Sequence, residues 1–405
     1  MLIQGVSIII SLVLNWYLAN NLGPSDYGIF VYAFSWVYLF GMFSMLGLDS
    51  VLQREIVKYT PDKIKSLVAF SRTVTLISSI VIMLLFALIV YLLSPEFEND
   101  LLRPLLTTIV CLPLFAQLLV NKSICLAYKK IEFSLFPEQV IRPAITLGLI
   151  VIFWTFIENP SLKSAILLSI VGIVIAFLSS FLFTARLKER NIVKESTSIK
   201  DWIKLGLTFF LLTATVTINS RADILMLGFF GHTEKVGIYN IAVKFSTFIA
   251  LPLFMANRIL SPYISQYFTS KKQELVTVIQ KIIRIIFTLG IIGFVIFIIA
   301  GESFLNYFGE EFQTAYFALL LLSGGQLINL FVGPVGTALR MSDFEKLALK
   351  SMIISTLINI VLNLVLIPLY EMNGAAIATF SSLIFWNIYQ YILVRRKLKM
   401  KFSVI

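Results

Sequence analysis

Three ionisable side chains stand in stretches of the sequence where almost every neighbour is apolar. Arg221 and Asp223 lie within INSRADILMLGFFG (218–231), and Lys244 lies in the next apolar run. A charge at the centre of a membrane helix costs about 3 kcal/mol on insertion scales, so it persists only with a compensating environment. Cationic side chains in such an environment can bind an anion, and phosphate groups are natural partners.

The helix predicted for 204–230 is polar over more than half of its circumference. At about 100° per residue, Asn219 and Asp223 share one stripe, and Arg221 lies on the adjoining face. Arg221 and Asp223 point in nearly opposite directions, so we expect each to need a partner from another helix. A helix that faces lipid does not carry such a surface, whereas a helix that lines a wet cavity can.

The following run, 237–260, offers partners at a similar depth. Lys244 lies about 10 Å below the outer end of this run, close to the depth of Arg221 and Asp223. The same run carries further polar residues on its face, namely Asn240, Asn257 and Arg258. In the first half of the chain, Asn15 takes the position that Asp223 has in the second. We therefore predict a substrate cavity that includes these residues.

Further cations lie near the ends of predicted helices on the inner side. These candidates for contact with a pyrophosphate are Arg54, Arg72, Lys122, Arg142 and Arg258. A structural alternative stays open for both groups. The deep charges could form a buried pair that holds two helices together, and the inner cations could simply follow membrane topology.

Composition places all of these residues in a membrane protein. The 405 residues are 58% hydrophobic and only 14% charged, and the mean hydropathy is +0.91. Apolar runs long enough to cross about 30 Å of hydrocarbon recur along the chain. We count twelve: 1–21, 29–52, 68–93, 101–127, 141–157, 165–187, 204–230, 237–260, 276–300, 314–338, 347–369 and 373–394.

The distribution of charge supports this count. Of the 33 lysines and arginines, 28 lie near the gaps that follow even-numbered runs or in the C-terminal tail, and three lie in the other gaps. This alternation is the positive-inside rule, so we expect both termini to face the cytoplasm. The net charge of +11 therefore follows from topology and gives no reason to expect nucleic acid.

Motifs for enzyme chemistry are not found in a suitable context. Cys111 and Cys125 fall in one predicted helix about 21 Å apart, too far to form a disulfide. The one histidine, His232, stands in an outer loop, so a histidine-based metal site is not expected. We predict a transporter without a metal or cofactor, and no catalytic residues.

The two halves of the chain resemble each other. GPSDYGIFVYAFS (23–35) and GHTEKVGIYNIAVKF (231–245) share a glycine, a polar turn and a Gly-Ile-aromatic triplet. Such parallel repeats recur in secondary transporters, with the substrate route between the halves. We predict an all-α membrane protein with two six-helix lobes around a central cavity. Its parts are an N-terminal lobe (1–187), a cytoplasmic linker (188–203), a C-terminal lobe (204–394) and a basic cytoplasmic tail (395–405).

Four stretches carry a family resemblance. They are NWYLANNLGPSDYGIFVYAFS, ADILMLGFFGHTEKVGIYNIAVKFS, NYFGEEFQTAYFALLLLSGGQ and NIVLNLVLIPLYEMNGAAIATFSS. They resemble the bacterial polysaccharide flippases, which are the O-antigen and repeat-unit translocases of the multidrug/oligosaccharidyl-lipid/polysaccharide exporter superfamily. The resemblance covers nearly the whole chain, and Asp223 falls where the family commonly has aspartate.

The resemblance implies a fold and an activity. It implies a twelve-helix, two-lobe exporter with a fold like that of the multidrug exporters. Such a protein moves undecaprenyl-pyrophosphate-linked oligosaccharide repeat units across the cytoplasmic membrane by alternating access. An H⁺ or Na⁺ gradient would drive the cycle, and polysaccharide polymerase machinery would be a partner. We expect protonation of Asp223 to couple transport to a proton gradient.

Two features depart from the family pattern. Family members usually carry a basic segment before the first helix, whereas Met1 lies within the first apolar run, as in a truncated or misassigned start. The run lacks the features of a signal peptide, so we expect a retained first helix. Glu371 and Met372 stand where a glycine-containing turn is common, which we interpret as loop variation.

Three alternatives stay open. A drug/cation antiporter would need acidic residues facing its cavity, and Asp223 is the only carboxylate that we place deep in a predicted helix. A lipid II flippase would also have a cationic cavity, so the sequence separates it poorly. A membrane glycosyltransferase or polymerase would need catalytic carboxylates or a large outer loop, and no outer loop exceeds about fifteen residues.

Overall fold

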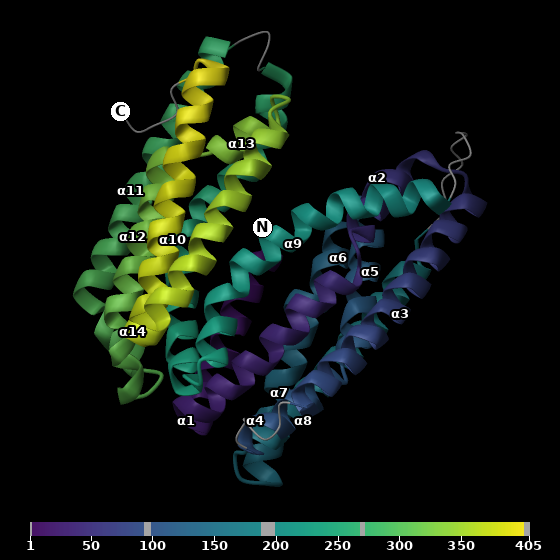
Figure 1. The fold of residues 1–405 in the computed structure, drawn as a ribbon, viewed down its shortest axis with the longest axis vertical. Coiled ribbons are helices and arrows are strands. Elements are labelled where there is room, and N and C mark those ends of the chain that lie inside the picture. The colour runs from purple at the N-terminus through teal and green to yellow at the C-terminus, as the bar shows by residue number, and fades with distance from the viewer. Residues whose placement is uncertain (1, 93–98, 188–198, 268–271, 401–405) are drawn as a thin grey trace. The chain divides into compact units, whose positions relative to one another are not determined.

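The computed structural model describes residues 2–92, 99–187, 199–267 and 272–400, and in these ranges the chain forms helices and no strand. Figure 1 shows the helices in chain order from purple to yellow. Most of the predicted linker, 188–198, and the end of the predicted tail, 401–405, lie outside the described residues. The expectation of an all-α protein is confirmed.

Nine helical segments of the described residues are long and apolar enough to cross a membrane. In addition, α4 and α5 together form one such segment, bent by 45°. The nine are Ile3–Ser44, Pro61–Leu92, Ile131–Phe156, Leu162–Ala185, Ile199–Phe229, Thr233–Tyr267, Gln273–Asn306, Glu310–Val332 and Glu345–Leu398.

Two of these segments are each interrupted near the middle. Ile3–Ser44 has 42 residues and Glu345–Leu398 has 54, whereas about 20 residues cross the hydrocarbon core. The backbone leaves the helical region at Gly23, which precedes Pro24, and at Glu371. Each segment therefore contains two membrane crossings. Counted in this way, the described residues hold twelve crossings, the number predicted from the apolar runs.

The described chain divides into two compact units between Arg221 and Ala222, within α9 (Ile199–Phe229). Most of α9 thus groups with the first unit. The other elements of the first unit are α1 (Leu2–Ser44), α2 (Leu48–Glu55), η1 (Ile56–Lys58), α3 (Pro61–Leu92), α4 (Asn99–Ile109), α5 (Leu112–Ala127), α6 (Ile131–Phe136), the π-helix η2 (Pro137–Ile141), α7 (Arg142–Phe156) and α8 (Leu162–Ala185).

Helix α5 forms the centre of the first unit. It packs against α1, α2, α3, α6 and α8, and its buried residues lie on every side of the helix. A helix that is apolar all round is typical of a buried position. The start of α9 packs on this unit as well, because the backbones at Gly47 and Gly206 approach closely and Trp202 donates a hydrogen bond to the hydroxyl of Tyr59.

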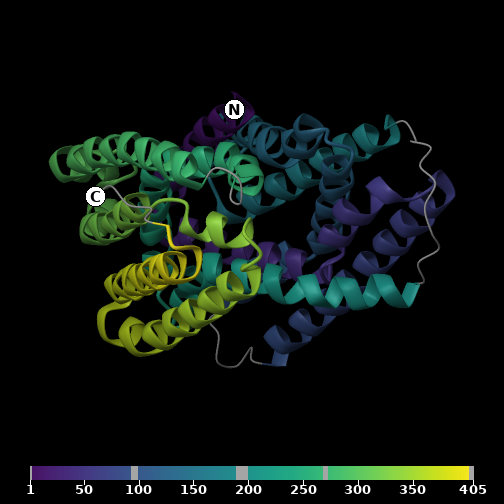
Figure 2. The ribbon, with the colours of Figure 1, turned by 90° about the horizontal axis from the view of Figure 1, so that it is seen from above.

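The second unit is built around α12. The elements that follow α9 are α10 (Thr233–Tyr267), α11 (Lys272–Asn306), η3 (Glu310–Ala315), α12 (Tyr316–Val332), α13 (Val335–Arg340), α14 (Glu345–Leu393) and the π-helix η4 (Val394–Leu398). Helix α12 packs against α10, α11 and α14, and Figure 2 shows these green-to-yellow helices bundled side by side. The two halves of α14 meet at the break at Glu371.

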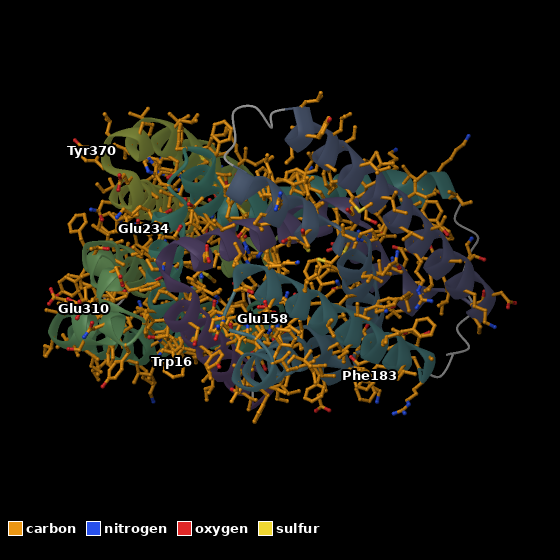
Figure 3. All side chains as sticks on the ribbon, turned by 90° about the horizontal axis from the view of Figure 1, so that it is seen from below. Trp16, Glu158, Phe183, Glu234, Glu310 and Tyr370 are labelled. Atoms are coloured by element: carbon orange, nitrogen blue, oxygen red, sulfur yellow. The ribbon has the colours of Figure 1, made fainter. Side chains whose placement is uncertain are left out.

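Large apolar side chains cover the outer faces of the helices in both units. Phe156 is 80% exposed and Ile299 is 79% exposed. In Figure 3, Trp16 and Tyr370 project from the ribbon in the same way. A water-soluble protein rarely exposes such a continuous apolar surface, whereas a multi-pass membrane protein presents it to lipid. The chain is therefore a multi-pass membrane protein.

Candidate functional site

The carboxylate of Asp223 is the centre of a polar cluster in the second unit. The hydroxyl of Tyr239 donates to Oδ2 at 2.8 Å, and the amide of Asn363 donates to Oδ1 at 2.8 Å. The hydroxyl of Thr379 also donates to Oδ2. Four crossings thus meet at Asp223: α9, α10 and both halves of α14. These three donors provide the hydrogen bonds that an ionised carboxylate needs when it is buried, and apolar neighbours could not provide them.

A second layer of polar side chains holds these donors in place. Asn363 donates to the side-chain oxygen of Asn359 at 3.0 Å, and Asn359 donates to Thr379 at 3.2 Å. Asn359 is also 3.4 Å from the hydroxyl of Ser382, which packs beside Ser355. This network was not among the residues predicted from the sequence. The spacing of Asn359 and Asn363 was the available signal, because two asparagines four residues apart share one face of an apolar helix.

The first unit contains a neutral counterpart of the Asp223 cluster. The hydroxyl of Tyr27 donates to Oδ1 of Asn15 at 2.6 Å, and Asn15 in turn donates to the backbone carbonyl of Ser11. In each half, therefore, a tyrosine on one crossing bonds a carboxyl or carboxamide on the crossing before it. Asn15 carries no charge, whereas Asp223 does when ionised.

Arg221 belongs to a different cluster, in the first unit. Its guanidinium carbon lies 4.5 Å from the centroid of the Tyr38 ring on α1, within the range of a cation–π contact. The Nε atom of Arg221 is buried and has no hydrogen-bond partner. Arg142 is near enough to Arg221 to repel it. Arg221 and Asp223 thus serve two separate sets of contacts although they are two residues apart.

Lys122 and Arg142 complete this second cluster. The ammonium of Lys122 lies 2.6 Å from Oε2 of Glu138, and Arg142 also interacts electrostatically with Glu138. The guanidinium of Arg142 lies 5.9 Å from the Phe115 ring. Lys122, Arg142 and Arg221 are hereafter called the cationic cluster. Its three positive charges exceed the single charge of Glu138, so the cluster favours a further anion.

A second carboxylate lies within reach of the cationic cluster. Asp49 on α2 interacts electrostatically with Lys122. Burial raises the pKa of the Asp49 carboxyl, and hydrogen bonds with Ser50 and the charge of Lys122 oppose this shift only in part. Oδ1 of Asp49 has no hydrogen-bond partner. The charge near Lys122 therefore depends on whether Asp49 holds a proton.

Glu138 corrects one prediction from the sequence. We expected Asp223 to be the only carboxylate deep in a membrane helix, with a helix beginning at 141. The structure instead continues the helix back to Ile131, through α6 and η2, and leaves Glu138 only 8% exposed. The predicted apolar run began at 141, so Glu138 fell outside it; the structure accommodates Pro137 and Pro143 because proline is tolerated where a helix begins or a π-turn forms. The spacing of Glu138 and Arg142, four residues apart, was the signal for a shared helix face.

Two other predicted inner cations have protein partners of their own in the first unit. Arg72 donates to Asn121 at 3.0 Å and to Thr184 at 3.5 Å, and it lies over the Phe181 ring. Arg54 is exposed and lies 3.5 Å from Glu55. These contacts place Arg72 in a network between α3, α5 and α8 and leave Arg54 at the surface.

The remaining predicted residues are dispersed along α9 and α10. Asn219 and Arg258 are exposed, and Arg258 lies over the Phe254 ring at 4.9 Å. Asn240 is buried, Lys244 is half-buried, and Asn257 accepts a hydrogen bond from Thr337 at 2.9 Å. The residue of α10 that hydrogen-bonds Asp223 is Tyr239, and the other two donors, Asn363 and Thr379, belong to α14.

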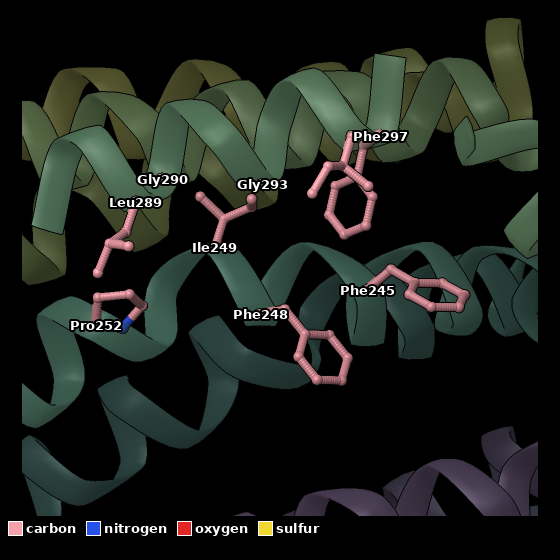
Figure 4. Close-up of a pocket in the computed structure, with 9 residues that line it drawn as sticks. Phe245, Phe248, Ile249, Pro252, Leu289, Gly290, Gly293 and Phe297 are labelled. Carbon is pink, nitrogen blue, oxygen red and sulfur yellow. The ribbon is translucent and has the colours of Figure 1, made fainter. Parts of the chain in front are cut away.

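The second unit also has an apolar groove between α10 and α11, which Figure 4 shows in close-up. It encloses about 290 Å³. Its lining consists of Phe245, Phe248, Ile249, Pro252, Leu289, Gly290, Gly293, Ile296 and Phe297. No side chain in the lining is polar, so the groove offers no chemistry beyond apolar contact. Among the described residues, no three His, Cys, Asp or Glu side chains gather as a metal site would require.

Comparison with protein families gives two matches. The family described as "Polysaccharide biosynthesis protein" matches residues 1–268, and the MatE family matches residues 209–365. The first match covers more than half of the chain.

Two curated proteins of Haloferax volcanii are similar to part of the chain. One is described as "Probable flippase AglR" and is 30% identical over 168 residues, which are 40% of this chain and 35% of that protein. The other is described as "Probable low-salt glycan biosynthesis flippase Agl15" and is 26% identical over 162 residues, 40% of this chain and 34% of that protein. The matched region thus spans about a third of the length of these relatives.

Solved structures share the fold over nearly the whole chain. An inward-facing multidrug resistance MATE family transporter of the MOP superfamily matches with a TM-score of 0.76 and 13% identity, covering 97% of this chain and 94% of that one. The lipid II flippase MurJ in an inward closed conformation matches with a TM-score of 0.75 and 16% identity, covering 97% and 87%. The expected architecture of this exporter superfamily is confirmed.

Proposed function

The chain belongs to the polysaccharide biosynthesis protein family, and we propose that it is a flippase for lipid-linked oligosaccharides. The substrate we propose is an undecaprenyl-pyrophosphate-linked repeat unit, moved from the inner to the outer leaflet of the cytoplasmic membrane. Both termini lie in the cytoplasm, as the distribution of basic residues indicates. The product would serve a polysaccharide polymerase on the outer side.

The observation that carries this proposal is the cationic cluster. Lys122, Arg142 and Arg221 gather among membrane helices with Glu138 as the carboxylate in direct contact. Unpaired charge among membrane helices is costly, so a surplus of cations is retained where an anion is bound during function. A pyrophosphate carries more than one negative charge and accepts many hydrogen bonds, and arginine forks match its oxygens.

The predicted residues take different roles in this mechanism. Arg54 and Arg258 are exposed and would attract the pyrophosphate at the cytoplasmic side, before it reaches Arg142 and the rest of the cluster. The sugars would pass polar side chains such as Asn219 while the prenyl tail stays in lipid. We place the coupling ion, H⁺ or Na⁺, at Asp223, because this carboxylate has three neutral donors around it and can exchange them for a bound cation or proton.

Transport in reconstituted liposomes tests the proposal. A fluorescent undecaprenyl-pyrophosphate oligosaccharide is placed in both leaflets, and a membrane-impermeant quencher reports its exchange. We expect Arg142→Gln and Arg221→Gln to lower the rate by about tenfold or more, the loss of one charge-assisted contact. Lys163→Gln, which removes an exposed cation on α8, is the matched control. Unchanged rates in both arginine variants would remove the cationic cluster from the function.

A second candidate function is cation-coupled export of drugs. The match of residues 209–365 to the MatE family favours it. This candidate predicts that the liposomes accumulate a cationic dye such as ethidium against an ion gradient, and that Asp223→Asn abolishes accumulation. Our proposal predicts no dye transport. Competition by lipid II in the oligosaccharide assay separates the proposed substrate from that of a lipid II flippase.

A further inference from the structure

Glu138 is the carboxylate in direct contact with the cationic cluster. Its Oε2 lies 2.6 Å from the ammonium of Lys122, and Arg142 interacts with it as well. The side chain of Glu138 is only 10% exposed, whereas that of Lys122 is 27% exposed. The carboxylate is therefore enclosed by protein, whereas the lysine side chain is partly exposed.

The local backbone places Glu138 and Arg142 in one turn. Glu138 lies in the π-helix η2, where the amide of Arg142 donates to the carbonyl of Pro137, five residues earlier. A π-turn widens the helix by one residue and is frequently found at functional sites. Here it brings a carboxylate and an arginine of the cluster to the same side of the helix. The negatively charged Glu138 therefore lies within the cationic cluster to which the pyrophosphate is proposed to bind.

We propose that Glu138 is a positioning residue that competes with the substrate's pyrophosphate for Lys122. Without substrate, the carboxylate holds Lys122 and limits the repulsion among the three cations. When the pyrophosphate arrives, Lys122 turns from Glu138 to the phosphate oxygens. When the lipid leaves, Glu138 takes the lysine back. The competition from Glu138 keeps the affinity of the cationic cluster for the pyrophosphate low enough for release, and a flippase must release its substrate in every cycle.

The asymmetry of exposure supports an exchange rather than a fixed pair. An ion pair with both partners enclosed resists separation, because moving either partner away leaves an uncompensated buried charge. In this pair only the carboxylate is enclosed. The lysine stem is long and flexible, so its ammonium can move to a ligand while Glu138 stays in place. This inference rests on the proposed function, because it names the residue that sets substrate affinity at the same site.

The test compares the affinity and the transport rate of one variant. Glu138→Gln keeps the shape of the side chain and removes its charge. The full-length protein in detergent is titrated with farnesyl pyrophosphate, and the liposome assay gives the rate. We expect the variant to bind farnesyl pyrophosphate about tenfold more tightly and to transport at least about fivefold more slowly. Glu158→Gln, an exposed glutamate after α7, is the matched control and is expected to change neither value.

A structural role predicts the opposite pattern. If Glu138 only stabilises the fold, the variant loses thermal stability and binds equally or less tightly, which overturns the inference. The double variant Lys122→Gln/Glu138→Gln is expected to return the affinity to near the wild-type value, because the competing partner and its target are both gone. Glu138→Asp keeps the charge but shortens the side chain, so a smaller tightening is expected there, and its absence counts against the proposal.

The outcomes also separate this inference from the proposed function. If the wild-type protein fails to bind farnesyl pyrophosphate and fails to transport the lipid-linked oligosaccharide, the proposed function itself fails. If the wild-type protein binds and transports, but Glu138→Gln binds no more tightly, only the role of Glu138 is refuted.

Discussion

Tyr239 on α10 donates a 2.8 Å hydrogen bond to the carboxylate of Asp223 on α9. In the first half of the chain, Tyr27 donates a similar hydrogen bond to the side chain of Asn15. Asn15 precedes the break in α1 at Gly23, and Tyr27 follows it. In both halves of the chain, a tyrosine thus hydrogen-bonds a side chain on the preceding membrane crossing. The acceptor is Asp223, which can carry a negative charge, in the second half and the neutral Asn15 in the first. An aspartate in this position can release its donors and bind a proton or cation, whereas an asparagine cannot change charge. This difference makes the second half the place for ion coupling in the proposed mechanism.

Replacement of Asp223 by alanine is expected to destabilise the protein strongly. The change leaves the donors of Tyr239, Asn363 and Thr379 without their acceptor. Each buried donor that loses its partner costs about 1–3 kcal/mol, so we expect a loss on the order of 3 kcal/mol or more in unfolding free energy. Thermal unfolding of the purified protein in detergent measures it. Asp62→Ala, at an exposed position in the first turn of α3, is the control and is expected to change stability far less.

Gly47 is predicted to tolerate no side chain. Its φ of 76° is in the left-handed region, and a Cβ there would lie 2.0 Å from the carbonyl oxygen of Gly206 on α9. Gly47→Ala must therefore separate α9 from the α1–α2 junction, and we expect a loss of about 3 kcal/mol or more. Gly148→Ala is the matched control, because nothing lies within 4 Å of its Cβ and alanine favours the helix by about 0.5–1 kcal/mol. Equal thermal stabilities of the two variants would contradict the prediction.

The sequence was sufficient for the membrane crossings and insufficient for the side-chain contacts. Crossings follow from the length of apolar runs, because about 20 residues must cover the hydrocarbon, and this constraint is local. The contact of Arg221 with Tyr38 depends on the packing of helices far apart in the sequence. No periodicity contains that information. The identification of Arg221 and Asp223 as unusual residues, by contrast, needed only their apolar surroundings.

The helix boundaries show the same limit in a different way. The prediction began one helix at 141, because the predicted apolar run begins there. The π-helix η2 accommodates Pro137 and carries the helix on from α6. Glu138 was therefore assigned to a loop and the carboxylate beside the cationic cluster was missed. Likewise, the turn at Glu371 was interpreted as loop variation, whereas the structure shows an unusual backbone conformation there.

Glu371→Gly is expected to stabilise the second unit. Glu371 has φ 50° and ψ −127°, a conformation that glycine adopts readily and other residues adopt at a cost of about 1–3 kcal/mol. The carboxylate lies 3.8 Å from Nδ1 of His232, and about half of the Glu371 side chain is exposed, so the lost contact is worth less than about 1 kcal/mol. The relief of strain therefore outweighs the lost contact. A higher midpoint of thermal unfolding is the expected result. Glu371→Gln, which removes the charge and keeps the strain, is the control and should not raise it.

Asp49 is expected to make the stability of the first unit depend on pH. Burial raises the pKa of Asp49, and Ser50 and Lys122 offset this only in part. A raised pKa means that the folded protein holds the proton more tightly than the unfolded chain, whose carboxyl titrates near about 3.9. The stabilising contribution of the protonated form is complete below that value. It is lost as the pH rises through the higher folded-state pKa, because the ionised carboxylate then has one oxygen, Oδ1, buried without a hydrogen-bond partner.

Asp49→Asn tests this dependence, since asparagine resembles the protonated carboxyl at every pH. We expect the variant to unfold at a midpoint a few degrees higher than the wild type, about 2–4 °C, at a pH near 8. The difference should shrink as the pH falls towards about 3.9, where the carboxyl of the unfolded chain titrates, because the wild type takes up its proton on the way. The unfolding midpoints of the wild type and of Asp49→Asn are measured by thermal unfolding in detergent across this pH range. Asp62→Asn removes an exposed carboxylate from the first turn of α3, where negative charge favours the helix, so it should lower stability slightly or leave it unchanged. A gain for Asp49→Asn that stays constant or grows as the pH falls would contradict the assignment of the effect to the ionised carboxylate of the half-buried Asp49.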